Sequence, residues 1–563
     1  MNRSFVWCCV VWVWTTSPLR AGGEWFTLTD FNGHWRSRAD DNHPLAKALA
    51  KHVEDNQEFK CVAFTPEGDW VLLSGTNDVW TSNESLPAVK KLLELRGAGH
   101  KFNCVAFTPT NGWVVLCDRM NPLSSNIPNG ALKQMEELVK NGSTLRSITF
   151  LPNGEWVLLV DEIGVFYSGG VPADLRKVLD GALKRRIAIR CVASTTFGDW
   201  FVITSKEYWA SDPNHPAAKQ LATSKNARQS LKWVTVAPED PATTRLRLDV
   251  TPAQHVKAVL KCDAFVDGKV EEFLIYAPEV PSVPGQKDIR TMFSPKGQIV
   301  HEDGPQQRPL IQTKISDGRQ EIRTALTIEA TLMSRRLRPL FAGEKGVPVP
   351  DLSPEEVKLF TLSSTMGQPN PAVFREWMER VGLKRKDGES DQMLGYRVLR
   401  YIKHHFRYES PTGDQSASAV CGAGKSDCMG LSNLFTWVMR DNGVPARKLI
   451  GRFADSGKMH DLKSAKPGSE GKEHVKAEFF IRGVGWVPVD TAAAVASPNA
   501  SDFAFIGDDP GNFITLSHDP LGTTDTFLTG KLHGIAAQGI SFDWRVSDKA
   551  RNVRFEITWT VTK

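Results

Sequence analysis

The amino-acid sequence predicts a multidomain protein: a repeated β-rich domain, then a β-sandwich-like domain, then an α+β domain. Three observations carry this prediction. A unit of about 43 residues recurs before residue 240, strand-like segments fill residues 239–340, and helical periodicity accompanies an ordered cysteine, histidine and aspartate in the C-terminal half. At 563 residues the chain is too long for one hydrophobic core, which agrees with several domains.

The residues before 240 contain an internal repeat. The aligned segments, of which the first is CVAFTPEGDWVLL, begin at Cys61, Cys104, Ser147 and Cys191. Their tryptophans are 43, 43 and 44 residues apart, and another lies 45 residues before the first: Trp70, Trp113, Trp156 and Trp200, preceded by Trp25. Each unit indicates two strands joined by a turn, a short third strand and then a stretch with helical spacing.

A period of about 43 residues with several strands per unit is typical of a β-propeller blade. The first unit lacks its leading strand, whereas LKWVTVAP from Leu231 supplies such a strand with no unit after it. We expect this strand to pair with the sheet of Trp25, because that pairing closes the ring and removes an open edge. Residues 22–238 are therefore predicted to form a β-propeller-like domain of about five blades with helices, with the recurring Trp and Cys side chains in its core.

Residues 1–21 have the pattern of a secretory signal peptide. Arg3 is followed by an apolar run of about ten residues, Phe5 to Trp14, and then by small residues up to Ala21. The alternative is a buried first strand, since Val and Trp also favour sheets. The run is too short to span a bilayer as a helix, and no later stretch reaches 18 apolar residues. We expect an exported protein, secreted or periplasmic, that does not span the membrane.

Composition excludes some partners and cofactors. The formal net charge of +5 is small for this length, and basic residues alternate with acidic ones, so no nucleic-acid partner is expected. Without Cys8 and Cys9 seven cysteines remain, an odd number that leaves at least one free thiol. No Cys or His cluster has the spacing of a zinc site and no EF-hand loop occurs, so we expect no metal and no cofactor.

The segments that flank the α+β region indicate strands. Between residues 239 and 340, segments such as TRLRLDV and EEFLIYA alternate or run apolar between turns rich in Pro and Gly. They predict a β-sandwich-like domain. At the C-terminus, ISFDWRV and VRFEITWTVT predict a β-hairpin over residues 536–563 that packs on one of the β domains.

The strongest chemical signal of the chain begins at Cys428. This cysteine directly precedes an amphipathic helix that Gly443 and Pro445 end, and whose apolar positions are Leu431, Leu434, Phe435 and Val438. A thiol at a helix N-terminus lies at the positive end of the dipole, which favours the reactive thiolate. Such a nucleophile needs a base and a group that orients the base.

Both partners are found downstream of the cysteine. His474 begins an alternating strand, EHVKAEFFI, and Asp490 ends the next one. A short turn at residues 483–485 predicts that the two strands form an antiparallel hairpin. Their side chains are then able to face Cys428, which predicts a catalytic triad with Cys428 as nucleophile, His474 as base and Asp490 as the residue that orients it.

The stretch from about 390 to 520 resembles the transglutaminase-like superfamily. The matching features are a cysteine before a helix that ends in Gly-Val-Pro-Ala-Arg (residues 443–447), a His-x-x-x-Glu strand (His474 and Glu478), and Gly-Trp-x-x-x-Asp (residues 485–490). The resemblance implies a papain-like α+β core, a transglutaminase-like catalytic domain that we place at residues 341–535. It also implies thiol acyl transfer on a peptide or carboxamide.

Some features depart from the family pattern or compete with the triad. Lys476 stands where members commonly have Trp, and the long polar segment 453–473 is a candidate lid. Tyr408 is a weak candidate for the side chain of the oxyanion hole. Cys421 is a rival thiol without a helix directly after it, and His460 is a rival base without a following strand.

The sequence therefore predicts a transglutaminase-like cysteine enzyme with a protein or peptide substrate, in which Cys428 forms a thioester acyl-enzyme. Water would resolve this intermediate in a peptidase or amidase, which we favour, and an amine would resolve it in a protein cross-linker. The propeller-like domain is expected to target the enzyme to a glycan or cell-surface ligand. The alternative is a non-catalytic binding protein in which the propeller-like domain binds glycan or protein and the transglutaminase-like domain is a scaffold.

Overall fold

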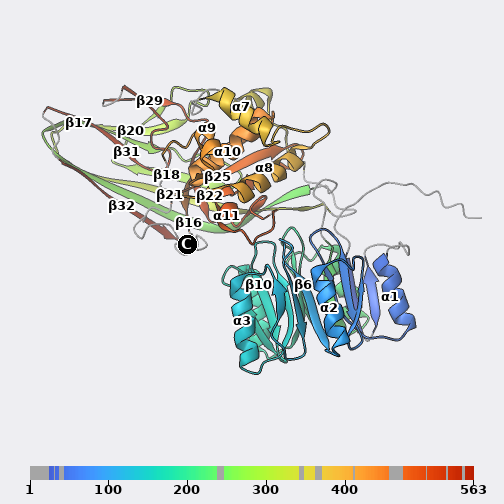
Figure 1. The fold of residues 1–563 in the computed structure, drawn as a ribbon. Coiled ribbons are helices and arrows are strands. Elements are labelled where there is room, and N and C mark those ends of the chain that lie inside the picture. Colours follow the sequence, from blue (N-terminus) through green and yellow to red (C-terminus); the bar gives the residue numbers. More distant parts are fainter. Residues whose placement is uncertain are drawn as a thin grey trace, which may run out of the picture.

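The computed structural model describes residues 25–30, 32–36, 44–237, 246–340, 348–361, 370–409, 413–454, 473–502, 504–527, 530–547 and 552–563. The predicted signal peptide, residues 1–21, and residues 455–472 of the predicted lid lie outside these ranges. Figure 1 shows the repeats as one body and the elements from β16 onwards as a second body above it. Within the described ranges, no helix is long and apolar enough to cross a membrane.

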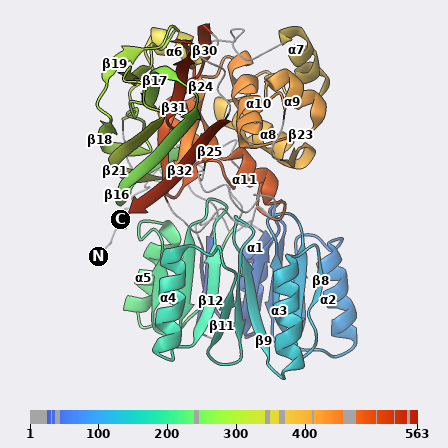
Figure 2. The same ribbon diagram turned by 90° about the vertical axis from the view of Figure 1, so that its left-hand side faces the viewer.

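The repeats form five antiparallel sheets of three strands, which we call the repeat domain. The sheets are β15 (Leu231–Val236), β1 (Trp25–Thr29) and β2 (Gly33–Arg36); β3 (Phe59–Phe64), β4 (Trp70–Ser74) and β5 (Asp78–Thr81); β6 (Phe102–Phe107), β7 (Trp113–Cys117) and β8 (Leu123–Ser125); β9 (Leu145–Phe150), β10 (Trp156–Val160) and β11 (Gly164–Tyr167); and β12 (Ile189–Ser194), β13 (Trp200–Thr204) and β14 (Tyr208–Ala210). A helix follows each unit: α1 (Pro44–Glu54), α2 (Pro87–Gly97), α3 (Asn129–Lys140), α4 (Ala173–Lys184) and α5 (Pro216–Asn226). Figure 2 shows these helices on the outside of the sheets.

The five sheets contact one another in a cycle. The leading strands β3, β6, β9, β12 and β15 touch in that order, and β15 touches β3 again. The predicted pairing of the strand at Leu231 with the sheet of Trp25 is confirmed, because Trp25 of β1 lies opposite Val236 of β15. The N-terminal and C-terminal ends of the repeats therefore share one sheet, which leaves neither end as an open edge.

Side chains at equivalent positions link neighbouring sheets. From one leading strand to the next, a nitrogen donates a hydrogen bond to a backbone carbonyl: Lys60 to Phe102 at 2.9 Å, Asn103 to Leu145 at 3.0 Å, Arg146 to Ile189 at 2.7 Å and Arg190 to Leu231 at 3.1 Å. These bonds satisfy carbonyl groups on the inner edges of the sheets. The recurring Trp70, Trp156 and Trp200 and the cysteines 61, 104 and 191 are buried, which confirms their predicted role in the core. Trp113 is half-buried and packs against the same core.

The middle of the chain forms two antiparallel sheets, the β domain. One sheet contains β18 (Gln286–Ser294), β21 (Glu321–Pro339), β16 (Leu246–Asp267) and β32 (Asn552–Thr562), with β27 (Asp508–Asp509) paired to β21; the other contains β19 (Gln298–His301), β20 (Pro309–Ile315), β17 (Val270–Pro278) and β31 (Ser541–Val546). Leu260 and Leu326 of the first sheet share a core cluster with Ala277 and Ile311 of the second. The two sheets therefore face each other across one hydrophobic core.

The predicted C-terminal hairpin is not formed. Instead, β31 pairs with β17 and β32 pairs with β16 over eleven residues, from Lys257 opposite Thr562 to Asp267 opposite Asn552. Each strand covers the open edge of a different sheet. The backbone groups at those two edges thereby gain hydrogen-bond partners, whereas a hairpin of the two strands would leave the edges unpaired. As predicted, both strands lie on the β domain.

The remaining elements form the α+β domain. Its helices are α6 (Pro354–Thr361), α7 (Pro371–Arg380), α8 (Asp391–His405), α9 (Ala417–Ala423), α10 (Cys428–Asp441) and α11 (Thr491–Ala496). Its sheet has the order β26 (Gly485–Val489), β25 (Glu473–Ile481), β24 (Ala446–Phe453) and β28 (Phe513–His518), and smaller pairs are β22 (Arg407–Tyr408) with β23 (Lys425–Ser426) and β29 (Thr523–Thr526) with β30 (Gly530–His533). Helix α10 packs on β25 and β24.

Local signals set the ends of these helices. The predicted capping box is present, because Ser353 N–H donates to Glu356 Oε2 at 2.8 Å and Glu356 N–H donates to Ser353 Oγ at 3.2 Å. Helix α10 ends as predicted at Gly443, whose φ of 76° is costly for other residues. Its predicted apolar positions, including Leu431 and Phe435, are fully buried.

Candidate active site

Cys428 is the first residue of α10, and its thiol is half-buried. The side chain of Asp427 caps the helix, accepting hydrogen bonds from Gly430 N–H at 3.1 Å and from Gln415 Nε2 at 2.5 Å. The sulfur therefore lies at the positive end of a capped helix, where the charge of a thiolate is stabilised.

Strand β23 runs directly against the first turn of α10. A Cβ at Gly430 would lie 2.0 Å from Ser426 Oγ and 2.9 Å from a methyl carbon of Val420, so a side chain at this position would collide. Strand β22 pairs in parallel with β23, and Tyr408 lies opposite Ser426. The absence of a side chain at Gly430 thus allows Tyr408 to approach the residues around Cys428.

His474 and Asp490 meet at the end of a hairpin. Strands β25 and β26 pair antiparallel, from Ile481 opposite Gly485 to Ala477 opposite Val489, which confirms the predicted hairpin. Asp490 caps helix α11 through Oδ1, which accepts from Ala493 N–H at 3.0 Å, and its Oδ2 lies 2.9 Å from His474 Nε2. One carboxylate therefore fixes both a helix terminus and the histidine ring.

The electrostatics of this pair favour an imidazolium. Burial by itself lowers the pKa of His474, but the charge and hydrogen bond of Asp490, followed by the hydrogen bond and charge of Cys428, raise it to about 9. Burial raises the pKa of Asp490, yet the charge and hydrogen bond of His474 and the charge of Lys476 bring it below its usual value. The proton therefore rests on His474 at neutral pH, beside an ionised Asp490.

Aromatic rings hold the imidazole in place. The ring of His474 stacks on Phe453 with centroids 4.8 Å apart and meets the edge of Phe513 at 6.2 Å. Because Asp490 holds Nε2 and the aromatic rings hold the ring plane, the direction of the second ring nitrogen, Nδ1, is also fixed. The structure thus brings together all three residues that the sequence singled out.

Part of the chain matches a known protein family. Residues 384–491, which include all three residues, match the model of the transglutaminase-like superfamily. This segment is a transglutaminase-like domain. An uncharacterized protein of Haemophilus influenzae is 33% identical over 90 residues, which are 14% of this chain and 24% of that relative, so the match spans about a quarter of the relative's length.

Two solved structures are similar to parts of this chain at low sequence identity. A candidate cysteine protease from Cytophaga hutchinsonii is 14% identical, with coverage of 56% of this chain and 94% of that chain and a TM-score of 0.36. The periplasmic domain of TgpA from Pseudomonas aeruginosa is 15% identical, with coverage of 42% and 75% and a TM-score of 0.24.

Lys476, where the family commonly has Trp, belongs to a buried chain of charges. Its Nζ lies 3.3 Å from Asp509 Oδ1, and Asp509 accepts from Arg335 Nη2 at 2.8 Å. Arg335 also donates to Glu478 at 2.7 Å, and Glu478 accepts from Arg447 at 2.6 Å. His474, Lys476 and Glu478 alternate along β25 and so share one face of the strand. The chain of charges thereby ties the histidine strand to β21 of the β domain.

Tyr408, which belongs to the transglutaminase-like domain, lies close to the triad residues. Burial, followed by the negative charges of Cys428, Asp427 and Asp490, raises the pKa of its hydroxyl. A phenol whose pKa is raised stays protonated and keeps its O–H as a hydrogen-bond donor. This placement fits the role in the oxyanion hole for which the sequence made Tyr408 a weak candidate.

The rival residues are placed differently. Cys421 is buried within α9, its Sγ donates to Ser418 O at 3.1 Å, and burial raises the pKa of its thiol. It therefore lacks the environment that favours a thiolate. His460 lies outside the described residues. In the described part of the chain, no group of three or more His, Cys, Asp or Glu side chains is arranged to hold a metal.

Sequence reasoning did not single out Asp427 and Gln415. The signal for Asp427 was present, because an aspartate directly before an amphipathic helix is a typical N-cap. Gln415 gave no such signal, since it lies thirteen residues before Cys428 and only the fold brings it to Asp427.

Proposed function

We propose that this protein is a cysteine enzyme that transfers acyl groups from peptide or carboxamide substrates. The Cys428 thiolate attacks the carbonyl carbon and forms a tetrahedral oxyanion. The oxyanion collapses, the C–N bond breaks, and the leaving amine takes its proton from the His474 imidazolium. A thioester between the substrate acyl group and Cys428 remains. The chemistry needs no electron transfer and no further reactant up to this point.

The observation that carries the proposal is the contact between His474 and Asp490 beside the N-terminus of α10. A 2.9 Å contact fixes Nε2, and the pKa of about 9 supplies a proton for the leaving amine. The helix N–H of Cys428 and the hydroxyl of Tyr408 are the proposed donors to the oxyanion. Asp490 orients His474 and stabilises the imidazolium.

We infer that water resolves the thioester, so that the protein acts as a peptidase or amidase. His474, neutral after the first half-reaction, takes a proton from water, and the hydroxide attacks the thioester carbonyl. The C–S bond breaks, the acid leaves, and the thiolate and imidazolium are restored. A protein amine in place of water would give a cross-link.

The proposed setting of the reaction is outside the cytoplasm. The apolar run Phe5–Trp14 supports export, to the periplasm or beyond the cell. The cyclic contacts of the five sheets support a propeller-like arrangement of the repeat domain. We propose that this domain binds a glycan or cell-surface ligand and places the transglutaminase-like domain near its substrate.

The test is substitution of the nucleophile. Cys428→Ala is expected to lower kcat/KM on peptide amides by about 10,000-fold or more, because no thioester forms. The matched control is Cys421→Ala, which removes a thiol of the same domain and is expected to keep activity. Both are measured with substrate profiling by mass spectrometry, which scores cleavage and cross-linking. Unchanged turnover in Cys428→Ala would refute the proposal, and cross-links without cleavage would refute hydrolysis.

A further inference from the structure

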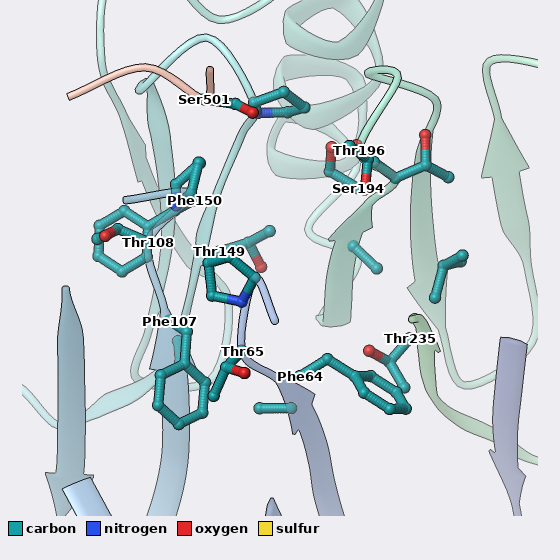
Figure 3. Close-up of a pocket in the computed structure, with 18 of the residues that line it drawn as sticks. Phe64, Thr65, Phe107, Thr108, Thr149, Phe150, Ser194, Thr196, Thr235 and Ser501 are labelled. Atoms are coloured by element: carbon teal, nitrogen blue, oxygen red, sulfur yellow. Dashed lines mark hydrogen bonds between the residues drawn. The ribbon is translucent and has the colours of Figure 1, made fainter. Parts of the chain in front are cut away.

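A cavity of about 510 Å³ lies between the repeat domain and the transglutaminase-like domain (Figure 3). Its walls are residues of the leading strands β3, β6, β9, β12 and β15 and of the turns that follow them. Its rim includes Arg400, His404, Ser501 and Asp502 of the transglutaminase-like domain. Both domains are needed to form this space, whose volume is typical of sites for small ligands.

Both aromatic and hydroxyl side chains line the cavity. Phe64, Phe107 and Phe150 occupy equivalent positions of three successive units, 43 residues apart, whereas the next unit has Ser194 at that position. Figure 3 shows Phe107 and Phe150 on one side, and Phe64, Ser194, Thr196 and Thr235 on the other. The ring of Phe107 is half-buried and presents an apolar surface to the cavity.

Two hydroxyl groups of the lining offer hydrogen-bond acceptors. Ser194 Oγ donates to Thr195 O at 3.1 Å, and Thr149 Oγ1 donates to Val192 O at 2.5 Å. Because the proton of each hydroxyl is directed at a backbone carbonyl, its oxygen lone pairs remain for donors of a ligand. An occupant with several O–H groups matches these acceptors.

The charged groups at the rim already have partners. Asp502 is bound by Arg400 at 3.1 Å and by His404 at 2.6 Å, and Glu67 accepts a hydrogen bond from Asn111. A charged occupant would lose hydration and find these charges engaged with one another, which disfavours it. The rim therefore selects for a neutral occupant.

The enclosure favours a compact occupant. Strands of all five sheets surround the cavity, and Ser501 and Asp502 border it from the other domain. Ser501 is held there by its N–H, which donates to Pro152 O at 2.6 Å. An extended peptide would need a groove that runs across a surface, whereas a single ring fits a space that lies within a ring of strands.

We propose that this cavity binds a neutral sugar residue of a glycan, with its C–H face on Phe107 and its hydroxyls directed at Ser194 and Thr149. The proposal rests on the proposed binding role of the repeat domain, but not on catalysis by Cys428. Because residues of both domains border the cavity, a glycan that carries an amide and is bound there would lie next to the domain that contains Cys428.

The experiment uses the full chain with Cys428→Ala, so that no probe is consumed. Glucose, N-acetylglucosamine and their β-1,4-linked disaccharides are titrated by calorimetry and by saturation-transfer NMR. At least one of them is expected to bind with one site per chain. Phe107→Ala and Ser194→Ala, which alter half-buried positions, are each expected to weaken Kd at least fivefold. Phe166→Ala on the outer strand β11, where the ring is 37% exposed, is the control and keeps the affinity.

Two kinds of result would overturn the proposal. One is the absence of saturable binding for all four sugars, or equal binding by the Cys428→Ala protein with and without each cavity substitution, with unchanged melting curves. The other is binding of a neutral peptide such as tetra-alanine amide at these residues with no sugar binding. If the wild-type protein turns over no amide but a sugar still binds, the result counts against the proposed catalysis and not against the sugar site.

Discussion

The pKa of His474 is the property that most directly links single residues to the proposed chemistry. It is raised to about 9 although the ring is buried, because Asp490 and Cys428 stabilise the charged form more than burial disfavours it. The imidazolium is thus available to protonate a leaving amine across the neutral range. Removing the charge of Asp490 tests this account without changing the size of the side chain.

Asp490→Asn is expected to lower kcat/KM on a peptide amide by about 100- to 10,000-fold. In the wild type the rate should fall as pH rises through about 9, where His474 loses its proton. In the variant this basic limb should move down by more than one pH unit. The measurement is kcat/KM from pH 5 to 10, and Asp303→Asn, an exposed carboxylate of the β domain, is the control. Identical basic limbs in variant and wild type would contradict the assignment.

The same pair sets a pH dependence of stability. A histidine whose pKa is higher in the folded than in the unfolded protein stabilises the fold fully below its ordinary value of about 6.5. That stability is lost as pH rises through about 9. The Tm difference between wild type and Asp490→Asn should therefore be largest below about pH 6.5 and shrink as the pH rises towards 10.

At the scale of secondary-structure elements, the N-terminus of α10 depends on its close contact with β23. The sequence predicted the helix from its apolar spacing and from Gly443, but gave no reason for Gly430. Only the packing of Ser426 and Val420 against that residue shows why a side chain is excluded there. The same contact places Tyr408 beside Cys428, so the close packing at Gly430 also supports the proposed chemistry of the site.

Gly430→Ala is expected to destabilise the protein by about 1–3 kcal/mol and to reduce activity, because the new methyl group pushes α10 away from β23. The matched control is Gly422→Ala in α9, where an added Cβ meets no atom within 4 Å. Thermal unfolding and kcat/KM of both variants provide the measurement. An equal response of the two variants would mean that the contact with Ser426 is unimportant.

Strand β25 carries a second element-scale feature, the buried charges of Lys476 and Glu478 with their partners. Arg335→Met would leave Glu478 and Asp509 without their shared cation and is expected to cost about 3–5 kcal/mol. Arg323→Met on the same strand β21 is the control, because its side chain is 79% exposed and should change stability by less than about 0.5 kcal/mol. Urea unfolding followed by fluorescence tests this difference. A loss below about 1 kcal/mol for Arg335→Met would contradict the role of the network.

At the scale of the whole molecule, a few contacts join the repeat domain to the rest of the chain. Arg336 of β21 lies 3.4 Å from Asp199 and donates to Phe197 O at 3.3 Å. Ser501 binds Pro152, and the segment after it supports the site, since Asp490 N–H donates to Phe505 O at 2.9 Å. A short segment therefore contacts the repeat domain at Ser501 and the backbone of the triad residue Asp490 at Phe505.

Arg336→Glu is expected to loosen the two bodies, because it removes both bonds and places a carboxylate beside Asp199. Small-angle scattering should show a larger radius of gyration, and hydrogen exchange at Ser501 should become faster. Arg319→Glu, which changes an exposed arginine of the β domain, is the control. Unchanged scattering and exchange in Arg336→Glu would show that other contacts suffice to hold the bodies together.

The sequence by itself determined the features that local spacing encodes. The 43-residue period appears because each unit buries the same positions, and the hairpin and α10 appear because apolar spacing and turn residues define them. Cys428, His474 and Asp490 could be named from their order and their flanking elements. Tertiary structure decided what depends on partners distant in the chain: the separate edges taken by β31 and β32, the bond of Gln415 to Asp427, and the charges around Lys476. It also decided the raised pKa of His474, because burial and neighbouring charge exist only once the chain has folded.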